Sequence, residues 1–302
     1  LQARMFNEIV RKLPTNEVEI EVSNGYATHI RSGKSEFHLI GQDSSEYPLL
    51  PELSADQQFS IPADLLKTII RETVFAVATS ESRPVLTGVH WHIHNDELIC
   101  VATDSHRLAR RKIKLDQLPA EVNSVVIPGK SLNELNKILE DSTNLVQIVM
   151  TNQQVLFKTE DVLFFSRLLE GNYPDTSRLI PTDFKTTVTI DGKSLLQAID
   201  RASLLAREDR NNVVRFETVE TNVVEISSNS PEIGKVEEEI TVSNMEGEGL
   251  KISFSAKYMM EALKAIDGQD VVIEFAGAMR PFIIRSIHDD AILQLILPVR
   301  TY

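Results

Sequence analysis

The sequence predicts an α+β fold made of repeated units, each with one amphipathic helix and an antiparallel sheet, and with two units in each domain. Three observations predict it: a helical pattern that recurs at a nearly constant spacing, alternation of apolar and polar residues between the helices, and turn signals between the strands. Five helices of this kind are expected, which is an odd number. We therefore expect domains at 1–55, 56–182 and 183–302, of which the first lacks its N-terminal half.

Composition narrows the class of protein. The 302 residues suit two or three domains, and 42% hydrophobic with 25% charged residues is typical of globular proteins. No apolar run approaches the roughly 20 residues that a membrane span needs. Cys100 is the single cysteine, which excludes an internal disulfide framework and a cysteine-rich zinc site and favours a cytoplasmic location.

The first helical pattern occurs in three copies. Residues 2–13 align with residues 128–139 at a shift of 126, and a further shift of 127 brings in residues 257–266. Apolar residues recur at i, i+3 and i+7, as in an amphipathic helix. The basic positions coincide at Arg4, Lys130 and Lys257, and again at Arg11, Lys137 and Lys264.

A second helical pattern lies between these copies. Residues 61–78 match residues 190–206 at a shift of about 130, which places Arg71 on Arg201. Lys67 and Lys193 are further basic residues of these two helices. Any amphipathic helices can align by chance, but charges that coincide across copies at nearly one shift disfavour that explanation.

Antiparallel strands are predicted between the helices. Val18, Ile20 and Val22 alternate with polar residues up to Asn24-Gly25, a strong hairpin signal. A strand at 26–30, a turn at 32–34 and a strand through Phe37 and Leu39 follow, and the next copy repeats this over 146–150, 155–158 and 162–169. Each of these copies ends in a similar loop, Glu46-Tyr47-Pro48 and then Asn172-Tyr173-Pro174.

The charge distribution has two interpretations. A net charge of −13 argues at first against a nucleic-acid partner, but net charge says nothing about where charges lie. Basic residues four or seven apart share one helix face, so units in a curved row would place basic faces on one side of an acidic body. The alternative is that these are solvated helix faces without a partner.

Four motifs, in the same order along the whole chain, resemble those of the bacterial DNA sliding clamp, the β subunit of DNA polymerase III. The family's Thr-Asp-Gly-His-Arg-Leu stands here as Thr103-Asp104-Ser105-His106-Arg107-Leu108, with serine where glycine is common. The other three are Arg83-Pro84-Val85-Leu86-Thr87-Gly88, Tyr173-Pro174-Asp175 with Arg178-Leu179, and Leu297-Pro298-Val299-Arg300.

The resemblance implies a DNA-clamp fold that forms a ring from a head-to-tail homodimer, with sheets outside and helices inside. Such a ring encircles duplex DNA, contacts it weakly and without sequence preference, and tethers the replicative polymerase; it has no catalytic activity and no cofactor. The DNA-facing residues would be Arg4, Arg11, Lys67, Arg71, Lys130, Lys137, Lys193, Arg201, Lys257 and Lys264.

The resemblance also implies a pocket for linear hydrophobic peptides of the polymerase, the clamp loader and repair enzymes. Its apolar floor would be Leu86, Leu108, Pro174, Leu179, Ile296 and Val299, and its polar rim Arg83, His106, Arg178 and Arg300. Thr103, Ser105, Arg107, Leu297 and Pro298 belong to the same motifs, and Tyr258 and Met279 match pocket positions in the third domain.

The subunit interface follows from the same resemblance. Phe37 and Leu39 would meet the third domain of the second copy, where Leu204 and Leu205 form the other side. Lys34 could pair with the acidic strand of the neighbour. The three acidic residues of that strand are Glu237, Glu238 and Glu239. The alternative is that Leu204 and Leu205 are ordinary core residues.

An enzyme is the first rival interpretation. Gly-Lys-Ser occurs at Gly33, Gly129 and Gly192, but a phosphate-binding loop needs another glycine five residues earlier. Thr28, Ser124 and Thr187 stand at those positions, and Asp104 with His106 has no activated nucleophile beside it in sequence.

Two further interpretations stay open. His90, His92 and His94 alternate onto one strand face, where two of them could bind a metal, although a solvated face is the expected outcome. A protein-only scaffold without a DNA role would use the same peptide pocket, and the basic helix faces are what distinguish it from a clamp.

Overall fold

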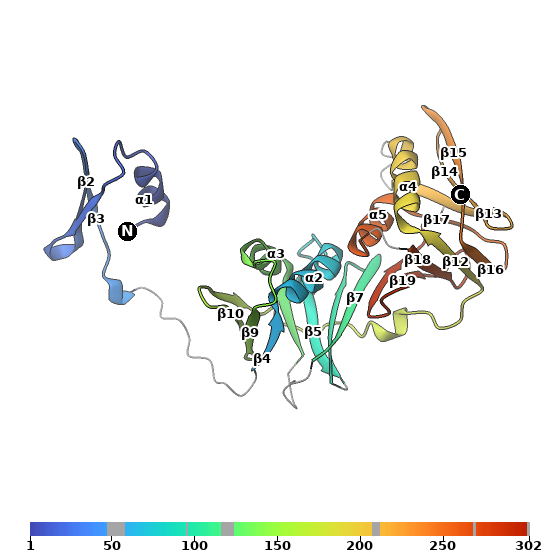
Figure 1. Cartoon of the computed structure of the whole chain (residues 1–302), viewed down its shortest axis with the longest axis horizontal. Coiled ribbons are helices and arrows are strands. Elements are labelled where there is room, and N and C mark those ends of the chain that lie inside the picture. Colours follow the sequence, from blue (N-terminus) through green and yellow to red (C-terminus); the bar gives the residue numbers. More distant parts are fainter. Residues whose placement is uncertain (47–57, 95, 116–123, 207–211, 268–269, 301–302) are drawn as a thin grey trace. The chain divides into compact units, whose positions relative to one another are not determined.

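The computed structural model describes residues 1–46, 58–94, 96–115, 124–206, 212–267 and 270–300 (Figure 1). The repeated loop at 46–48 therefore lies largely outside the described residues. The chain forms two compact units, Leu1–Glu52 and Leu53–Tyr302, which we call unit 1 and unit 2 and describe separately.

Unit 1 is one helix and a three-stranded antiparallel sheet in the order β1-β2-β3. Its elements are α1 (Ala3–Val10), β1 (Glu19–Val22), β2 (Ala27–Ser32), β3 (Ser35–Ile40) and the short 3-10 turns η1 (Asn24–Tyr26) and η2 (Ser44–Glu46). The predicted helix and all three predicted strands are present here.

The two hairpins of this sheet differ. Ser32 pairs with Ser35 across a two-residue loop, where Gly33 adopts a φ of +58°, as the predicted turn requires. At Asn24-Gly25 the loop is longer, because a 3-10 turn intervenes and pairing resumes only at Val22 with Thr28.

Alternation gives the sheet of unit 1 two different faces. Ile30 is fully buried on one face and Phe37 pairs opposite it, whereas His29 and His38 pair on the other face. Ile9 of α1 is the second buried hydrophobic residue among those that the structure describes in this unit, and Ile20 on β1 stays exposed. The described part of unit 1 therefore buries few apolar side chains, which predicts low stability by itself.

Unit 2 contains four helices and seventeen strands among its described residues. Its first half comprises β4 (Gln58–Pro62), α2 (Ala63–Thr73), η4 (Val74–Ala76), η5 (Pro84–Thr87), β5 (Gly88–His94), β6 (Glu97–Thr103), β7 (Arg107–Lys114), β8 (Val125–Pro128), α3 (Gly129–Ile138), β9 (Leu145–Met150), β10 (Gln154–Lys158) and β11 (Leu163–Arg167). Its second half comprises η6 (Ser177–Leu179), β12 (Thr186–Asp191), α4 (Gly192–Ala206), β13 (Val213–Glu220), β14 (Val223–Ser230), β15 (Gly234–Thr241), β16 (Asn244–Gly247), β17 (Lys251–Ser255), α5 (Ala256–Ala265), β18 (Asp270–Phe275), β19 (Phe282–Ser286) and β20 (Ile292–Ile296).

These strands form three sheets. Two have four strands, in the orders β11-β10-β9-β4 and β15-β14-β13-β17, and the third has nine, in the order β16-β12-β18-β19-β20-β7-β6-β5-β8. In the nine-stranded sheet β7 pairs with β20, with Leu108 opposite Leu295. Because this pairing crosses 182/183, unit 2 is continuous there, and the domain boundary stays a prediction.

Three hydrophobic clusters hold unit 2 together. One lies under α2 and α3 and includes Trp91, and another lies under α4 and α5 and includes Phe254. The third, around Leu108, packs on the opposite face of the joined sheet. Strand β6 is buried on both faces, which explains why its sequence is a nearly continuous apolar run.

The four helices of unit 2 form a row. Contacts join α3 to α2, α2 to α5, and α5 to α4. Figure 1 shows them consecutively along one side of the unit, with strands on the other side. No helix in the described ranges is long and apolar enough to cross a membrane.

Candidate peptide pocket and helix row

The turn between β6 and β7 carries the residues that sequence analysis placed at the pocket. Thr103 Oγ1 donates to the carbonyl of Arg107 at 2.6 Å, and Asp104 Oδ1 accepts from the backbone N–H groups of His106 at 2.9 Å and Arg107 at 3.1 Å. The aspartate side chain thus caps the turn, as Asx residues do. This leaves the His106 side chain exposed at its tip.

Ser105 adopts a left-handed conformation in this turn, with a φ of +78°. Glycine takes such a φ without steric cost, and this explains why the resembling motif commonly has glycine there. The serine hydroxyl accepts a hydrogen bond from Arg83 Nη1 at 3.3 Å. Ser105 therefore ties the predicted rim residue Arg83 to the turn.

Arg107 is the hub of the contacts behind the turn. Its Nε donates to Asp104 Oδ2 at 2.9 Å, its Nη2 donates to the Phe75 carbonyl at 2.6 Å, and its Nη1 pairs with Glu261 of α5. Its guanidinium also lies 4.5 Å from the ring centroid of Tyr258, a cation–π contact. Arg107 is only 7% exposed, so its predicted role as a pocket-lining residue is wrong and its role is to position the turn.

The C-terminal segment and α5 lie beside the same turn. Leu297 N donates to the carbonyl of His106 at 3.0 Å, and the His106 ring stacks on Tyr258 with centroids 6.5 Å apart. Val299 N donates to the carbonyl of Ser253 at 2.7 Å, which holds the segment against β17. The structure therefore brings together the motifs at 103–108 and 297–300 and Tyr258, as the sequence predicts.

The predicted apolar floor requires a correction. Leu86, Leu108 and Ile296 are 3%, 2% and 1% exposed, because they pack into the cores of unit 2, and Thr103 is buried as well. Among the apolar residues predicted for the pocket, Leu179 and Met279 are 46% and 57% exposed, and Tyr258, Leu297, Pro298 and Val299 are half-buried. Among the other predicted pocket residues, Pro174, Arg178 and Arg300 are exposed, and Arg178 lies 3.6 Å from Asp175.

A second buried ion group, missed by sequence analysis, joins the two halves of unit 2. Arg111 of β7 lies between Glu72 of α2, at 3.4 Å from Nε to Oε2, and Asp289 of the β19–β20 turn. Burial raises the pKa of Glu72 to about 7, and Arg111 only partly offsets this. Because Arg111 also pairs with Asp289, it cannot fully neutralise Glu72.

We expect stability to fall as Glu72 ionises. Its folded pKa of about 7 lies above the ordinary glutamate pKa of 4.5, so its stabilising contribution is complete below pH 4.5 and is lost as the pH rises through 7. Between pH 5 and pH 8, the free energy of unfolding of Glu72→Gln should rise relative to wild type by roughly 2 kcal/mol. Urea denaturation at both pH values measures this, and a difference that is constant with pH would contradict it.

The histidines of β5 do not form the solvated face that was expected. His90 is half-buried, stacked between His92 and Tyr173 with ring centroids 4.8 and 4.7 Å away, and hydrogen-bonded to Ser124. Burial, aided by His92, lowers the pKa of His90 to about 4, so its imidazole is neutral at pH 7. His94 alone of the three is exposed.

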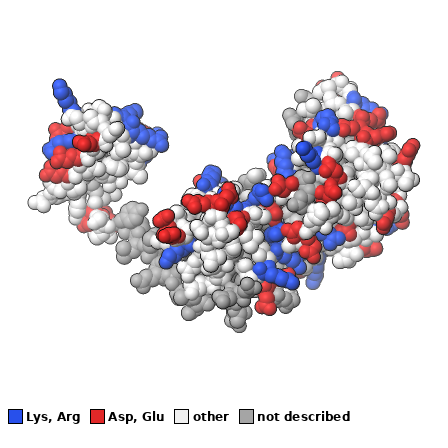
Figure 2. Space-filling view, viewed as in Figure 1, with Lys and Arg blue, Asp and Glu red and all other residues white. Residues whose placement is uncertain are grey.

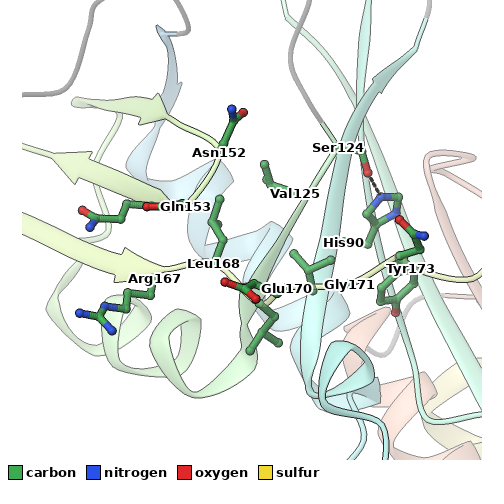
Figure 3. Close-up of a pocket in the computed structure, with 14 residues that line it drawn as sticks. His90, Ser124, Val125, Asn152, Gln153, Arg167, Leu168, Glu170, Gly171 and Tyr173 are labelled. Carbon is green, nitrogen blue, oxygen red and sulfur yellow. Dashed lines mark hydrogen bonds between the residues drawn. The ribbon is translucent and has the colours of Figure 1, made fainter.

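A polar cavity of about 760 Å³ lies beside this stack (Figure 3). The start of β8 at 124–126, residues 152–154 where β10 begins, and the segment 167–173 line it together with His90. Tyr173, which stacks on His90, is the first residue of the predicted peptide-binding loop. Of the lining residues, the sequence motifs had marked only His90, Asn172 and Tyr173, because the cavity wall is assembled from segments that lie far apart in the sequence.

Basic side chains of the helix row lie among acidic ones (Figure 2). Lys67 pairs with Asp141 at 2.8 Å, Arg71 with Asp267 at 3.9 Å, and Lys137 with Glu134 at 2.7 Å. Four exposed lysines of the row have no ion pair with any described residue. They are Lys130, Lys193, Lys257 and Lys264.

The predicted interface residues also differ in availability. Leu204 is 59% exposed, so the alternative interpretation of it as a core residue is wrong. Leu205 is half-buried. Glu238 accepts from Arg201 Nε at 2.8 Å and Glu237 pairs with Lys235, so both acids have partners in their own chain. Arg201, predicted to face DNA, is likewise paired within its own chain, and its DNA-facing role stays a prediction. In unit 1, Phe37 and Leu39 are half-buried, Lys34 and Arg11 are exposed, and Arg4 lies 3.3 Å from Glu8.

Comparison with known proteins agrees with this arrangement. Models of the N-terminal, central and C-terminal domains of the DNA polymerase III beta subunit match residues 1–51, 60–175 and 177–300. The chain belongs to the DNA polymerase III beta subunit family. The recognition made from sequence motifs is thereby confirmed.

Relatives within this family are similar over the whole chain. The beta sliding clamp of Bacillus subtilis is 61% identical over all 302 residues, which are 80% of its own length, and that of Staphylococcus aureus is 52% identical over the same span. The crystal structure of the DNA polymerase sliding clamp from B. subtilis superposes with a TM-score of 0.94 over 100% of this chain and 80% of that one. The Streptococcus pneumoniae DNA polymerase III beta chain, 44% identical, superposes with a TM-score of 0.91 over the same shares.

Membership of this family confirms the clamp fold and gives the chain the function of a DNA sliding clamp. This is a processivity factor of DNA polymerase with no catalytic step of its own. The particular residues that contact DNA, peptides or a second copy are a separate matter.

Proposed function

We propose that this chain pairs with a second copy to encircle duplex DNA in the cytoplasm and turns its helix row toward the DNA. The observation that carries this is the row of four adjacent helices in unit 2, on which exposed lysines recur that pair with no acidic group in the described part of the chain. A ring holds DNA by enclosure, so weak phosphate contacts suffice and a net charge of −13 is no obstacle.

Lys130, Lys193, Lys257 and Lys264 are the better candidates for contacting phosphate. A lysine already paired with a carboxylate must give up that partner before it can neutralise a phosphate, which reduces the gain. Lys67, Arg71 and Lys137 are therefore secondary members of the DNA-facing set.

Charge reversal tests this proposal. We expect Lys130→Glu with Lys257→Glu to reduce retention on nicked circular DNA. The plot of the logarithm of the DNA-binding constant against log salt concentration should become shallower, its slope decreasing in magnitude by about 2. Binding of a polymerase-derived peptide should not change, because the pocket lies elsewhere. Retention is measured by gel filtration of DNA-loaded protein over 50–200 mM salt.

The matched control reverses two exposed strand lysines, Lys114→Glu with Lys158→Glu, which changes the net charge equally. If both double variants lose retention to the same extent, net charge and not the helix row determines DNA contact. If neither does, a protein-only scaffold becomes the better interpretation.

The second element of the proposal is the peptide pocket. Exposed Leu179 and Met279, together with half-buried Tyr258, Leu297 and Val299, would accept the apolar side chains of a linear peptide. His106, Arg83, Arg178 and Arg300 would supply polar anchors at the edge. Polymerase, clamp loader and repair enzymes would compete for this pocket through similar peptides.

The third element is the subunit interface. The second copy would contribute Leu204 and Leu205 of α4 against Phe37 and Leu39 of β3, and exposed Lys34 would meet Glu239, the acid of the strand that has no ion pair with a described residue. Apolar contact flanked by opposite charges is typical of such interfaces. The domain boundaries at 55/56 and 182/183 are part of the same proposal.

A further inference from the structure

The polar face of the sheet in unit 1 carries six ionisable side chains. They are Glu19, Glu21, His29, Arg31, Glu36 and His38. The strand register places them in two rows across the sheet, one with His29 between Glu21 and His38 and one with Arg31 between Glu19 and Glu36. Three carboxylates and one guanidinium leave two negative charges on this face when both histidines are neutral.

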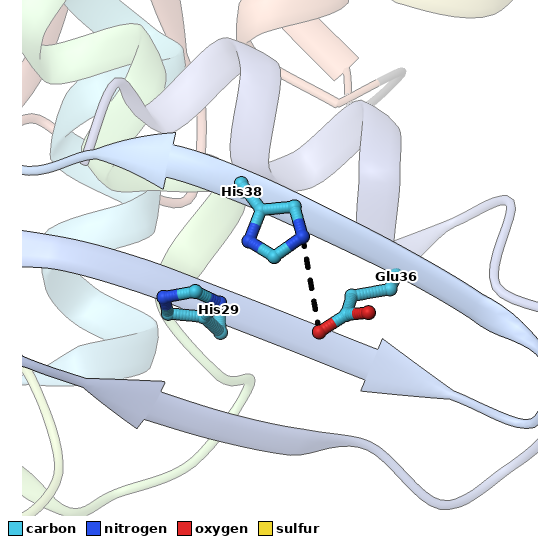
Figure 4. Close-up of side chains that lie close together, drawn as sticks. All are labelled: His29, Glu36 and His38. Atoms are coloured by element: carbon cyan, nitrogen blue, oxygen red, sulfur yellow. Dashed lines mark ion pairs between the residues drawn. The ribbon is translucent and has the colours of Figure 1, made fainter.

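Within this face three side chains converge (Figure 4). The rings of His29 and His38 meet edge to face with centroids 4.5 Å apart, and His38 Nε2 lies 3.8 Å from Glu36 Oε1. One ligand atom from each of His29, Glu36 and His38 lies within 4.8 Å of the other two. His29 Nδ1 is buried and has no hydrogen-bond partner among the described residues.

We propose that His29, Glu36 and His38 bind one late first-row divalent metal ion, with Zn²⁺ as the representative. Two imidazoles and a carboxylate are ligands that such ions prefer, whereas Mg²⁺ and Ca²⁺ prefer oxygen ligands alone. Zn²⁺ bonds of about 2.0 Å place tetrahedral ligand atoms about 3.3 Å apart, so these atoms need to approach by at most about 1.5 Å. Rotation of exposed side chains supplies that movement.

The charges around the three side chains favour a divalent ion. Two positive charges neutralise the excess on this face, and Glu21, paired opposite His29 on β1, is placed to supply a fourth ligand. Arg31 Nε holds Glu36 Oε1 at 2.9 Å and competes for this carboxylate. Arg31 also lies 3.5 Å from Glu21 and 3.9 Å from Glu19, so it keeps a partner when the metal takes Glu36.

The ion would join β2 to β3 directly. His29 is on β2, and Glu36 and His38 are on β3, whose opposite face carries Phe37 and Leu39. Because unit 1 buries few apolar side chains, a metal that links two of its three strands adds a large share of its stability. The metal thereby stiffens the strand that we propose for the subunit interface, although the site itself does not depend on that proposal.

The test uses the whole chain without an affinity tag. Calorimetric titration with Zn²⁺ should find one equivalent bound, and Co²⁺ should give the visible absorption of a tetrahedral site with nitrogen ligands. His38→Gln, at a side chain that is 61% exposed, should weaken binding by at least about 10-fold, and Glu36→Gln should weaken it too. Exposed His288, changed to glutamine, is the control and should bind as wild type does.

A second measurement locates the ion. Zn²⁺ should slow amide hydrogen exchange over residues 27–40 in wild type and leave it unchanged in His38→Gln. Equal Zn²⁺ affinity in wild type and His38→Gln would overturn the proposal, as would binding that protects only residues outside this sheet.

Discussion

Replacing Arg107 with alanine is expected to lower the free energy of unfolding of unit 2 by about 3 kcal/mol. The guanidinium compensates Asp104 and Glu261, donates to the Phe75 carbonyl and lies against Tyr258, all with the side chain only 8% exposed. Its removal leaves two carboxylates without a compensating cation. Removing one partner of a buried ion pair is strongly destabilising, because the remaining charge is buried and uncompensated. Urea denaturation at pH 7, followed by circular dichroism, measures the change.

Two further variants make the result specific. Arg178→Ala removes an arginine of η6 whose side chain is 90% exposed, and it should change stability by less than about 0.5 kcal/mol. Arg107→Lys keeps the charge but not the planar fork of donors, so most of the loss should persist. An Arg107→Ala variant as stable as Arg178→Ala would show that the contacts of Arg107 contribute nothing net.

The second large effect concerns the peptide pocket. Leu179→Ala with Met279→Ala should weaken a hydrophobic polymerase-tail peptide by about 2 kcal/mol, roughly 30-fold in Kd, because apolar anchors dominate such interfaces. Both side chains are largely exposed, so the free protein should keep its stability. Isothermal titration calorimetry gives the affinity directly.

A matched double variant serves as the control. Leu163 and Ile287, at 49% and 42% exposed, are surface hydrophobic residues outside the motifs, and replacing both with alanine should leave the peptide affinity unchanged. If the double variant Leu179→Ala with Met279→Ala bound the peptide as tightly as wild type, these two residues would not belong to the pocket. Tyr258 and Leu297 would then be the next candidates for its apolar contacts.

The repeat made the fold predictable. A helical period recurring at shifts of 126 to 130 residues placed all five helices within a few residues of α1 to α5. Alternation placed β1, β2, β3, β9, β10 and β11 equally well. Local pattern determines these elements, because each must bury one face whatever its neighbours are.

The site was less predictable, because contacts between distant residues determine it. Leu108 belongs to the pocket motif, yet pairing with β20 buries it, and Arg107 is drawn inward by Glu261, 154 residues away in sequence. Charge spacing predicted basic helix faces but could not reveal that Lys67 meets Asp141 or that Arg201 meets Glu238. Neither partner lies on the same helix, so no pattern within one element could indicate it.

The ladder between β7 and β20 has a mechanical consequence. Residues 297–300 continue directly from β20, which is hydrogen-bonded to β7 on one side and to β19 on the other. Tension along this tail would act parallel to the strand and load both rows of backbone bonds in shear, so that they share the force and do not open one by one. A partner held beside His106 would therefore be anchored to the backbone of the nine-stranded sheet, and the strain of a moving polymerase would spread across both halves of unit 2.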